Sequence, residues 1–293
     1  MSQVIAATYT FCNEPFFEYT LANISPLVDS MIVLETYIGP NRNLVRTDRI
    51  EQIINQSPYK NKIIYENLGK VPDKEFISDY VLYLMRSIAD EGDWLVFMGS
   101  DEAWYPEAIT LLREVNENIL EIMFPFWDFI GDFNHILIYD PPREAFHNFE
   151  VFYDIFDNWM VNGIYHERAY RWFKGYHYGN NHTAVKDSKD RYIYNHSFYK
   201  DKRIYIPHDS KKLRWTHYGN LGTQKFQSAK KKYYDDQKSE FTDKDFIYRY
   251  ISTGNDSNLP LFFRIEEINI EHPYPFNDHP WRNLSREEIF NAE

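Results

Sequence analysis

Asp101 and Glu102 are adjacent carboxylates that follow a short apolar segment of the chain. Residues 94–98 read Trp-Leu-Val-Phe-Met, and they lead through Gly99 and Ser100 into the acidic pair. A run this short, bounded by turn-forming residues, is typical of a buried β-strand. Open α/β sheets bind ligands at the carboxyl ends of their strands, and hard cations prefer oxygen ligands. The pattern therefore indicates a ligand or cation site, with an acidic turn that caps the following helix as the alternative.

A second acidic strand end is expected closer to the amino terminus. Residues 4–9 and 31–35 are compact apolar or β-branched segments, and residues 16–23 between them form a candidate helix. A strand, a polar loop and a helix are the opening of a nucleotide-binding α/β unit. Glu35 would then end the second strand, where its carboxylate could accept hydrogen bonds from a base or ribose. An exposed loop acid is the alternative for Glu35.

The alternation of strands and helices continues up to the acidic pair. Residues 47–56 and 73–90 have the spacing of amphipathic helices, residues 62–65 form a short strand between them, and a helix is expected at 106–118. Such alternation predicts an α/β fold with a mostly parallel sheet. Right-handed crossovers then bring the strand ends to one edge.

Together these segments resemble those of GT-A glycosyltransferases, in particular the large inverting family 2. Members of that family carry an Asn-Glu pair after the first strand, an acid at the end of the second, and Asp-x-Asp followed by Glu at the metal-binding strand end. The corresponding residues here are Asn13, Glu14, Glu35 and the segment 99–102, in which Gly99 stands in place of the first aspartate. The resemblance implies a GT-A, Rossmann-like fold with a C-terminal acceptor or lid region.

The resemblance also implies roles for individual residues. Asp101 would hold a divalent cation, Mn²⁺ or Mg²⁺, on the diphosphate of a nucleotide-sugar donor, with Glu102 in support. His217, at the end of a late strand, would complete the metal site, and an imidazole ligand favours Mn²⁺; a hydrogen-bonded core histidine is the alternative. The donor-binding candidates are Thr8, Thr10, Asn13, Glu14, Glu35, Arg86, Ser100 and Asp101.

The sequence leaves the catalytic base open. In the family a His-Glu pair lies beneath the acceptor, whereas His182 is followed here by Thr183. A transferase of this kind needs a base that takes the proton from the acceptor hydroxyl. By residue type the catalytic candidates are Asp187, Asp128, Asp132 and His182.

The composition is that of an acidic globular protein. Of 293 residues, 43% are hydrophobic and 18% aromatic, and 32 basic against 44 acidic residues give a net charge of −12. This charge argues against nucleic acid as a partner. With one cysteine, no signal-like start and no apolar run of about 18 residues, we expect a cytoplasmic protein without a transmembrane segment. The abundant aromatic side chains would suit stacking on sugar or base rings as well as packing.

The sequence as a whole predicts a metal-dependent glycosyltransferase that moves a sugar from a nucleotide-diphosphate sugar to the hydroxyl of a saccharide or other acceptor, for example in polysaccharide biosynthesis. The resemblance favours inversion. We expect a donor-binding half at 1–118, an acceptor-side half at 119–235 and a C-terminal extension at 236–293. Within the second half, segments 119–132 and 146–159 are interpreted as the acceptor side or a lid. The alternatives are a sugar nucleotidyltransferase and a non-catalytic carbohydrate-binding protein on the same fold.

Overall fold

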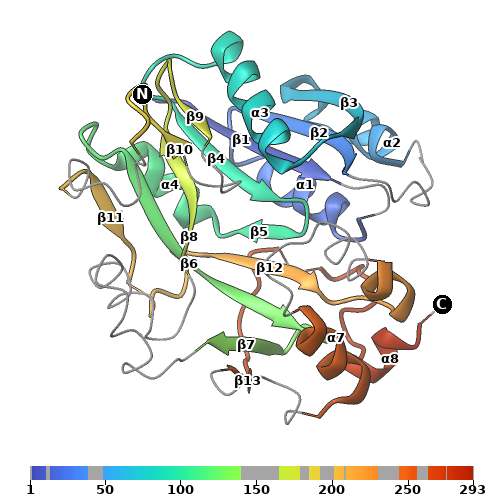
Figure 1. Cartoon of the computed structure of the whole chain (residues 1–293). Coiled ribbons are helices and arrows are strands. Elements are labelled where there is room, and N and C mark those ends of the chain that lie inside the picture. The colour runs from blue at the N-terminus through green and yellow to red at the C-terminus, as the bar shows by residue number, and fades with distance from the viewer. Residues whose placement is uncertain are drawn as a thin grey trace. The chain divides into compact units, whose positions relative to one another are not determined.

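The computed structural model describes ten stretches of the chain, namely residues 2–10, 14–38, 49–139, 165–178, 185–191, 201–207, 209–229, 244–255, 263–274 and 276–292. The chain divides into two compact units, and Figure 1 labels the helices and strands of both. The first unit comprises Met1–Pro125 and Tyr165–Trp215, and the second comprises Phe126–Ile164 and Thr216–Glu293. The three-part division at residues 118 and 235 groups residues by role and stays a prediction.

Four parallel strands form the centre of the first unit. They lie in the order β3-β2-β1-β4 and are β1 (Val4–Thr10), β2 (Ser30–Ile38), β3 (Ile63–Val71) and β4 (Trp94–Gly99). Beyond β4 lies β8 (Tyr165–Arg171), which is antiparallel to β4 and to the first half of β6 (Glu121–Ile130). A short β11 (Arg203–Tyr205) pairs in parallel with β6. The predicted α/β fold with a mostly parallel sheet is confirmed.

Helices connect the parallel strands. They are α1 (Phe17–Ile24), α2 (Arg49–Gln56), α3 (Lys74–Ile88) and, after the short β5 (Glu102–Trp104), α4 (Pro106–Glu114). A single 3₁₀ turn, η1 (Lys60–Lys62), precedes β3. The side chain of Asp73 caps α3 by accepting a hydrogen bond from the amide of Phe76 at 2.8 Å. Because crossovers of this kind are right-handed, α1 and α2 cover one face of the sheet and α3 covers the other.

A two-stranded ladder packs near α3 in the same unit. It consists of β9 (His177–Tyr178) and β10 (Val185–Lys186), which pair antiparallel. The amide of Tyr178 donates to Asp79 of α3 at 3.2 Å, and its ring lies 5.7 Å from that of Phe97 in β4.

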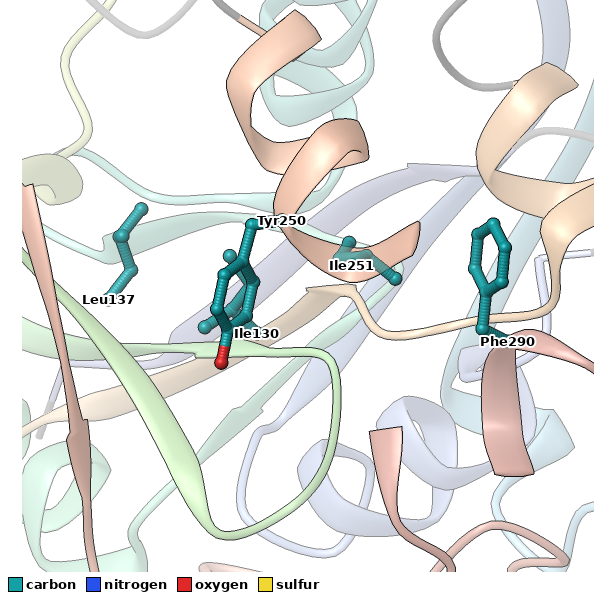
Figure 2. Close-up of a cluster of buried hydrophobic side chains, with 5 residues drawn as sticks. All are labelled: Ile130, Leu137, Tyr250, Ile251 and Phe290. Atoms are coloured by element: carbon teal, nitrogen blue, oxygen red, sulfur yellow. The ribbon is translucent and has the colours of Figure 1, made fainter. Parts of the chain in front are cut away.

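The second unit is built on an antiparallel ladder. The last residues of β6 pair with β7 (His135–Tyr139), which pairs in turn with β13 (Phe263–Glu267). The unit also contains most of β12 (Trp215–Asn220), α7 (Lys244–Thr253) and α8 (Arg286–Phe290). Figure 2 shows an apolar cluster of this unit, to which β6, β7, α7 and α8 contribute side chains. Its members are Ile130, Leu137, Tyr250, Ile251 and Phe290.

The structure describes one of the two segments that were expected to form the acceptor side or a lid. The segment 119–132, interpreted as the acceptor side or a lid, contains the ten-residue strand β6. Its Pro125 does not break the strand because β6 continues to pair with β8 at this position. The segment 146–159 lies outside the described residues. Over the part of the chain that is described, none of the helices has the length and apolar character needed to cross a membrane.

Candidate functional site

The strand order of the first unit reverses between β1 and β4. From β1 the chain moves outward to β2 and β3, and then returns to the other side of β1 to form β4. In doubly wound sheets ligands bind in the crevice at this point, outside the carboxyl ends of the strands. The register places Tyr9 beside Gly99 and Thr10 beside Glu35. The structure therefore brings Thr10, Glu35, Ser100 and Asp101 to one edge of the sheet.

Gly99 lies where the two predicted metal-binding carboxylates converge. A Cβ atom at position 99 would lie 2.6 Å from Oδ1 of Asp101 and 2.9 Å from Oε1 of Glu102. Both carboxylates thus point back over the end of β4, and they occupy the space that a side chain at residue 99 would need. This accounts physically for glycine at the position where the resembling family has its first aspartate.

The two carboxylates have different surroundings. Glu102 is fully buried, and its Oε1 accepts a hydrogen bond from Nη2 of Arg168 on β8 at 2.7 Å. The guanidinium of Arg168 also stacks on Trp215, 5.0 Å from the ring centroid. Asp101 is only half-buried. Glu102 is therefore enclosed by protein, and Asp101 is the more accessible of the two carboxylates.

The helix-capping alternative for this acidic pair is wrong. The residue that caps α4 is Tyr105, which makes no side-chain capping hydrogen bond, and Pro106 occupies the first turn. Instead, α1 holds the segment in place. Thr20 donates to the carbonyl of Ser100 at 2.9 Å, and Asn23 bonds both the amide and the carbonyl of Trp104.

Glu35 is buried at the end of β2 and held by β3. Its Oε2 accepts hydrogen bonds from the hydroxyl of Tyr65 at 2.5 Å and from the amide of Asn67 at 3.1 Å. Burial, and then the hydrogen bond to Glu35, raise the pKa of Tyr65, so the phenol remains a donor. A β-bulge beside Glu35, with Gly69 at a φ of 62°, turns Asn67 toward this carboxylate. Glu35 is thus a fixed acceptor and not an exposed loop acid.

The structure describes three of the four remaining donor-binding candidates. Thr8 is fully buried beside Met98, two residues before the end of β1. Glu14 is buried at the start of α1, and its carbonyl accepts from Arg49 at 3.1 Å. Arg86 is exposed in the last turn of α3, which leads back to the amino ends of the strands, so the structure does not bring it to this edge. Asn13 lies outside the described residues.

Among the catalytic candidates, Asp187 is committed to a turn. Its carboxylate accepts from the amides of Lys189 and Arg191 and pairs with the guanidinium of Arg191 at 2.6 Å. Asp132, in the second unit, bonds Nδ1 of His135 at 2.7 Å and the amide of Asn134 at 2.8 Å. Both carboxylates are buried. The oxygens of both carboxylates are therefore already engaged in hydrogen bonds within their own turns.

Asp128 and His217 lie together in the second unit. Oδ1 of Asp128 contacts Nδ1 of His217 at 2.6 Å and accepts from the side-chain amide of Asn220 at 2.8 Å. The side chains of Asp128 and His217 are 14% and 19% exposed, so solvent reaches both. A carboxylate bonded to one ring nitrogen fixes the tautomer and orientation of the imidazole.

The shared metal site predicted for Asp101 and His217 stays a prediction, because the two residues belong to different units. Among the described residues, no group of three or more His, Cys, Asp and Glu side chains is arranged to hold a metal ion. His182 lies outside the described residues.

The structure adds residues to which the sequence had assigned no role. One of them is Arg168, whose partner Glu102 is 66 positions away in the sequence. Tyr65 and Asn67 are two positions apart on β3, so their side chains lie on the same face of the strand, and both donate to Glu35. Period-two alternation would have suggested the pair only if the strand had been extended beyond residue 65. No protein-family model matches the chain, and neither does any curated protein.

Proposed function

We propose that the chain is a glycosyltransferase that uses a nucleotide-diphosphate sugar and a divalent cation. The observation that carries this proposal is the point of strand reversal, where the ends of β1, β2 and β4 place Thr10, Glu35 and Asp101 on one sheet edge. Nucleotides bind at such points in doubly wound sheets. A fixed buried acceptor at Glu35 suits the donor groups of a base or ribose.

The residues present fit a cation held largely by phosphate oxygens. Asp101 is half-buried at the strand end, and its neighbour Glu102 is neutralised by Arg168. Cations of this kind commonly take one or two protein carboxylates and complete their coordination with phosphates and water. When bound, the cation would offset the charge that develops on the leaving diphosphate. Asp101 would hold it together with phosphate oxygens and water.

The acceptor hydroxyl must lose a proton as it attacks the sugar. Asp128 is the best-suited of the described candidates because its side chain is the most exposed of the three. It is 14% exposed, whereas Asp132 and Asp187 are each 8% exposed. Inversion at the anomeric carbon follows from direct attack by the acceptor and is part of the same proposal.

The test is a screen for release of nucleoside diphosphate from nucleotide sugars, with Mn²⁺ or Mg²⁺, using the full chain and Asp101→Asn. We expect release by the parent and at least a hundredfold loss in the variant, because one charge-stabilising group typically contributes about 10²–10³ in rate. The matched control is Asp209→Asn, which changes an exposed carboxylate in the same unit and should leave release unchanged.

Two outcomes would oppose the proposal. Equal release by Asp101→Asn and the parent would remove the metal assignment. Formation of nucleoside triphosphate from nucleotide sugar and pyrophosphate would instead indicate a nucleotidyltransferase. Thermal stabilisation of the parent by a nucleoside diphosphate with Mn²⁺ provides a second readout of donor binding that does not depend on turnover.

A further inference from the structure

Helix α3 carries a row of aromatic side chains on its outer face. Phe76, Tyr80 and Tyr83 follow one another at helical spacing, and the side chains of Phe76 and Tyr83 are 42% and 60% exposed. Within the described part of the chain, these two are the large hydrophobic side chains classed as exposed. An exposed apolar cluster of this kind points to a binding function more strongly than a scattered apolar residue does.

The row is not needed to anchor α3 to the sheet. The helix buries a separate stripe against the core, which consists of Ile77, Val81, Leu82, Leu84 and Met85. The aromatic rings instead pack on one another. Phe76 and Tyr80 lie 6.2 Å apart with planes inclined by 17°, and Tyr80 and Tyr83 lie 5.7 Å apart.

Tyr80, in the middle of the row, is held in place from the sheet. Its hydroxyl donates to Oε2 of Glu66 on β3 at 2.5 Å. This hydrogen bond is the main reason that the pKa of Tyr80 is raised to about 12, so the phenol stays protonated at neutral pH. Holding the central ring reduces the conformational entropy that a ligand would otherwise have to remove when it binds.

We propose that Phe76, Tyr80 and Tyr83 form a platform that binds a neutral saccharide chain. One face of a pyranose ring is lined by C–H bonds, which carry partial positive charge and stack on the negative face of an aromatic ring. The three rings follow one another along the helix, with centroids 6.2 and 5.7 Å apart, so they form a continuous row on which more than one sugar ring of a chain could rest.

The charges around the platform argue for a neutral ligand. The charged residues that flank the aromatic rings in sequence are of both signs, with four acids and three bases, namely Glu66, Asp73, Glu75, Asp79, Lys70, Lys74 and Arg86. Single-stranded nucleic acid also stacks on aromatic side chains, but it requires a positively charged groove for its phosphates. An anionic membrane likewise attracts a cluster of basic residues, which this mixed surface does not present.

The size of the platform argues against a protein partner. A stable protein interface buries roughly 800 Å² on each side, whereas a whole aromatic side chain contributes about 150–250 Å². Three partly exposed rings therefore fall well short of an interface between two copies of the chain. They are sufficient for a ligand that presents two or three sugar rings.

The platform begins near the proposed donor site and leads away from it. Phe76 lies in the first turn of α3, shortly after the carboxyl end of β3, and Tyr83 lies two turns further along. The inference goes beyond the proposed function, since the platform would bind saccharide whether or not the chain transfers sugar. In a transferase it would hold the part of an acceptor that does not react.

The test is affinity electrophoresis of the full chain in gels that contain neutral β-1,4-, β-1,3- or α-1,4-linked glucans. We expect at least one glucan to retard the parent, and Phe76→Leu/Tyr83→Leu to lose at least tenfold in affinity. Phe76→Tyr/Tyr83→Phe keeps both rings and should bind like the parent. The leucine variant separates ring stacking from general hydrophobic contact, and both positions are exposed enough to tolerate it.

Several results would overturn the inference. These are no retardation of the parent by any of the three glucans, equal retardation of the parent and the leucine variant, loss of a dimer in the leucine variant, or retention of the parent by single-stranded oligothymidylate through these rings. Nucleoside diphosphate binding should be the same in the parent and in the leucine variant. Failure of the platform and failure of the donor site are therefore distinguished by different variants and different ligands.

Discussion

The two units of the molecule accommodate two pairs of buried titratable groups in different ways. In the first unit the carboxylates of Glu102 and Glu121 lie against the guanidinium groups of Arg168 and Arg203. In the second unit the buried histidines His272 and His279 are neutral and packed among aromatic rings. The first arrangement depends on each ion keeping its partner, and the second depends on the pH. The difference teaches that these two carboxylates stay buried through compensation of charge, whereas these two histidines stay buried by remaining neutral.

Removal of Arg168 should have the largest effect on stability. Arg168→Ala leaves the carboxylate of Glu102 buried without its ion-pair partner, and breaking such a pair costs about 3–5 kcal/mol. The measurement is urea denaturation at neutral pH. Glu102→Leu/Arg168→Met should recover most of the loss, because removing both charges also removes the uncompensated one.

The control for this prediction is Lys212→Ala. Lys212 pairs with Glu107 at 3.2 Å, but the two side chains are 54% and 45% exposed, so the expected cost is below about 1 kcal/mol. If Arg168→Ala and Lys212→Ala cost the same, the first unit does not depend on compensation of buried charge.

Acidification should lower the free energy of unfolding through the buried histidines of the second unit. Desolvation by burial lowers the pKa of both His272 and His279 from 6.5 to about 4. Nδ1 of His272 bonds the hydroxyl of Tyr218 at 2.8 Å, and Nδ1 of His279 accepts from the amide of Trp281. Neutral imidazole supplies these acceptors, whereas a protonated ring would be surrounded by Phe129, Phe133 and Phe276.

The sign of the pH dependence follows from these pKa values. The unfolded chain takes up protons at these histidines near pH 6.5, and the folded chain does so only near pH 4. Their contribution to the free energy of unfolding is therefore complete above pH 6.5 and is lost as the pH falls toward 4. The loss is at most about 2–3 kcal/mol per histidine. Urea denaturation at pH 7.5, 6 and 4.5 measures it.

The variant that sharpens this test is His272→Asn/His279→Asn, which retains polar side chains but cannot take up a proton in this range. Its free energy of unfolding should depend less steeply on pH between 6.5 and 4 than that of the parent. His177→Asn, at an exposed position of the first unit, is the matched control and should follow the parent. Identical slopes for all three proteins would contradict the neutral state proposed for the buried histidines.

The sequence predicted the parallel strands of the first unit better than the other elements. The parallel strands β1, β2 and β4 are short apolar runs separated by amphipathic helices, so their periodicity identified them and the edge on which Glu35 and Asp101 lie. Strand β6 was missed because Pro125 and Asp128 interrupt its apolar pattern, although Pro125 still pairs with β8 and Asp128 with β7. Helix α7 was missed because its sequence is highly charged at its start.

The partners of the site residues could not be predicted, for a physical reason. Arg168 reaches Glu102 only because β8 lies beside β4, and Tyr65 reaches Glu35 only through the register of β2 and β3. Such cross-strand contacts depend on topology and register, which local periodicity does not specify. The resemblance pointed to Glu35 and Glu102, and the fold identifies Tyr65 and Arg168 as partners of these carboxylates.

Gly99→Asp should have the smallest effect on stability and the clearest dependence on a cation. The new side chain would enter the space held by Oδ1 of Asp101 and Oε1 of Glu102, and it would add a third carboxylate to the end of β4. The half-buried side chain of Asp101 can move aside, whereas Glu102 is buried and held by Arg168, so the cost without metal should be about 1–2 kcal/mol. Mn²⁺ should recover that cost, since hard oxygen ligands converge on one point. Gly99→Asn adds a side chain of the same size without charge and should gain nothing from Mn²⁺. Thermal unfolding with and without the ion measures both, and equal shifts for Gly99→Asp and Gly99→Asn would mean that no cation binds at this strand end.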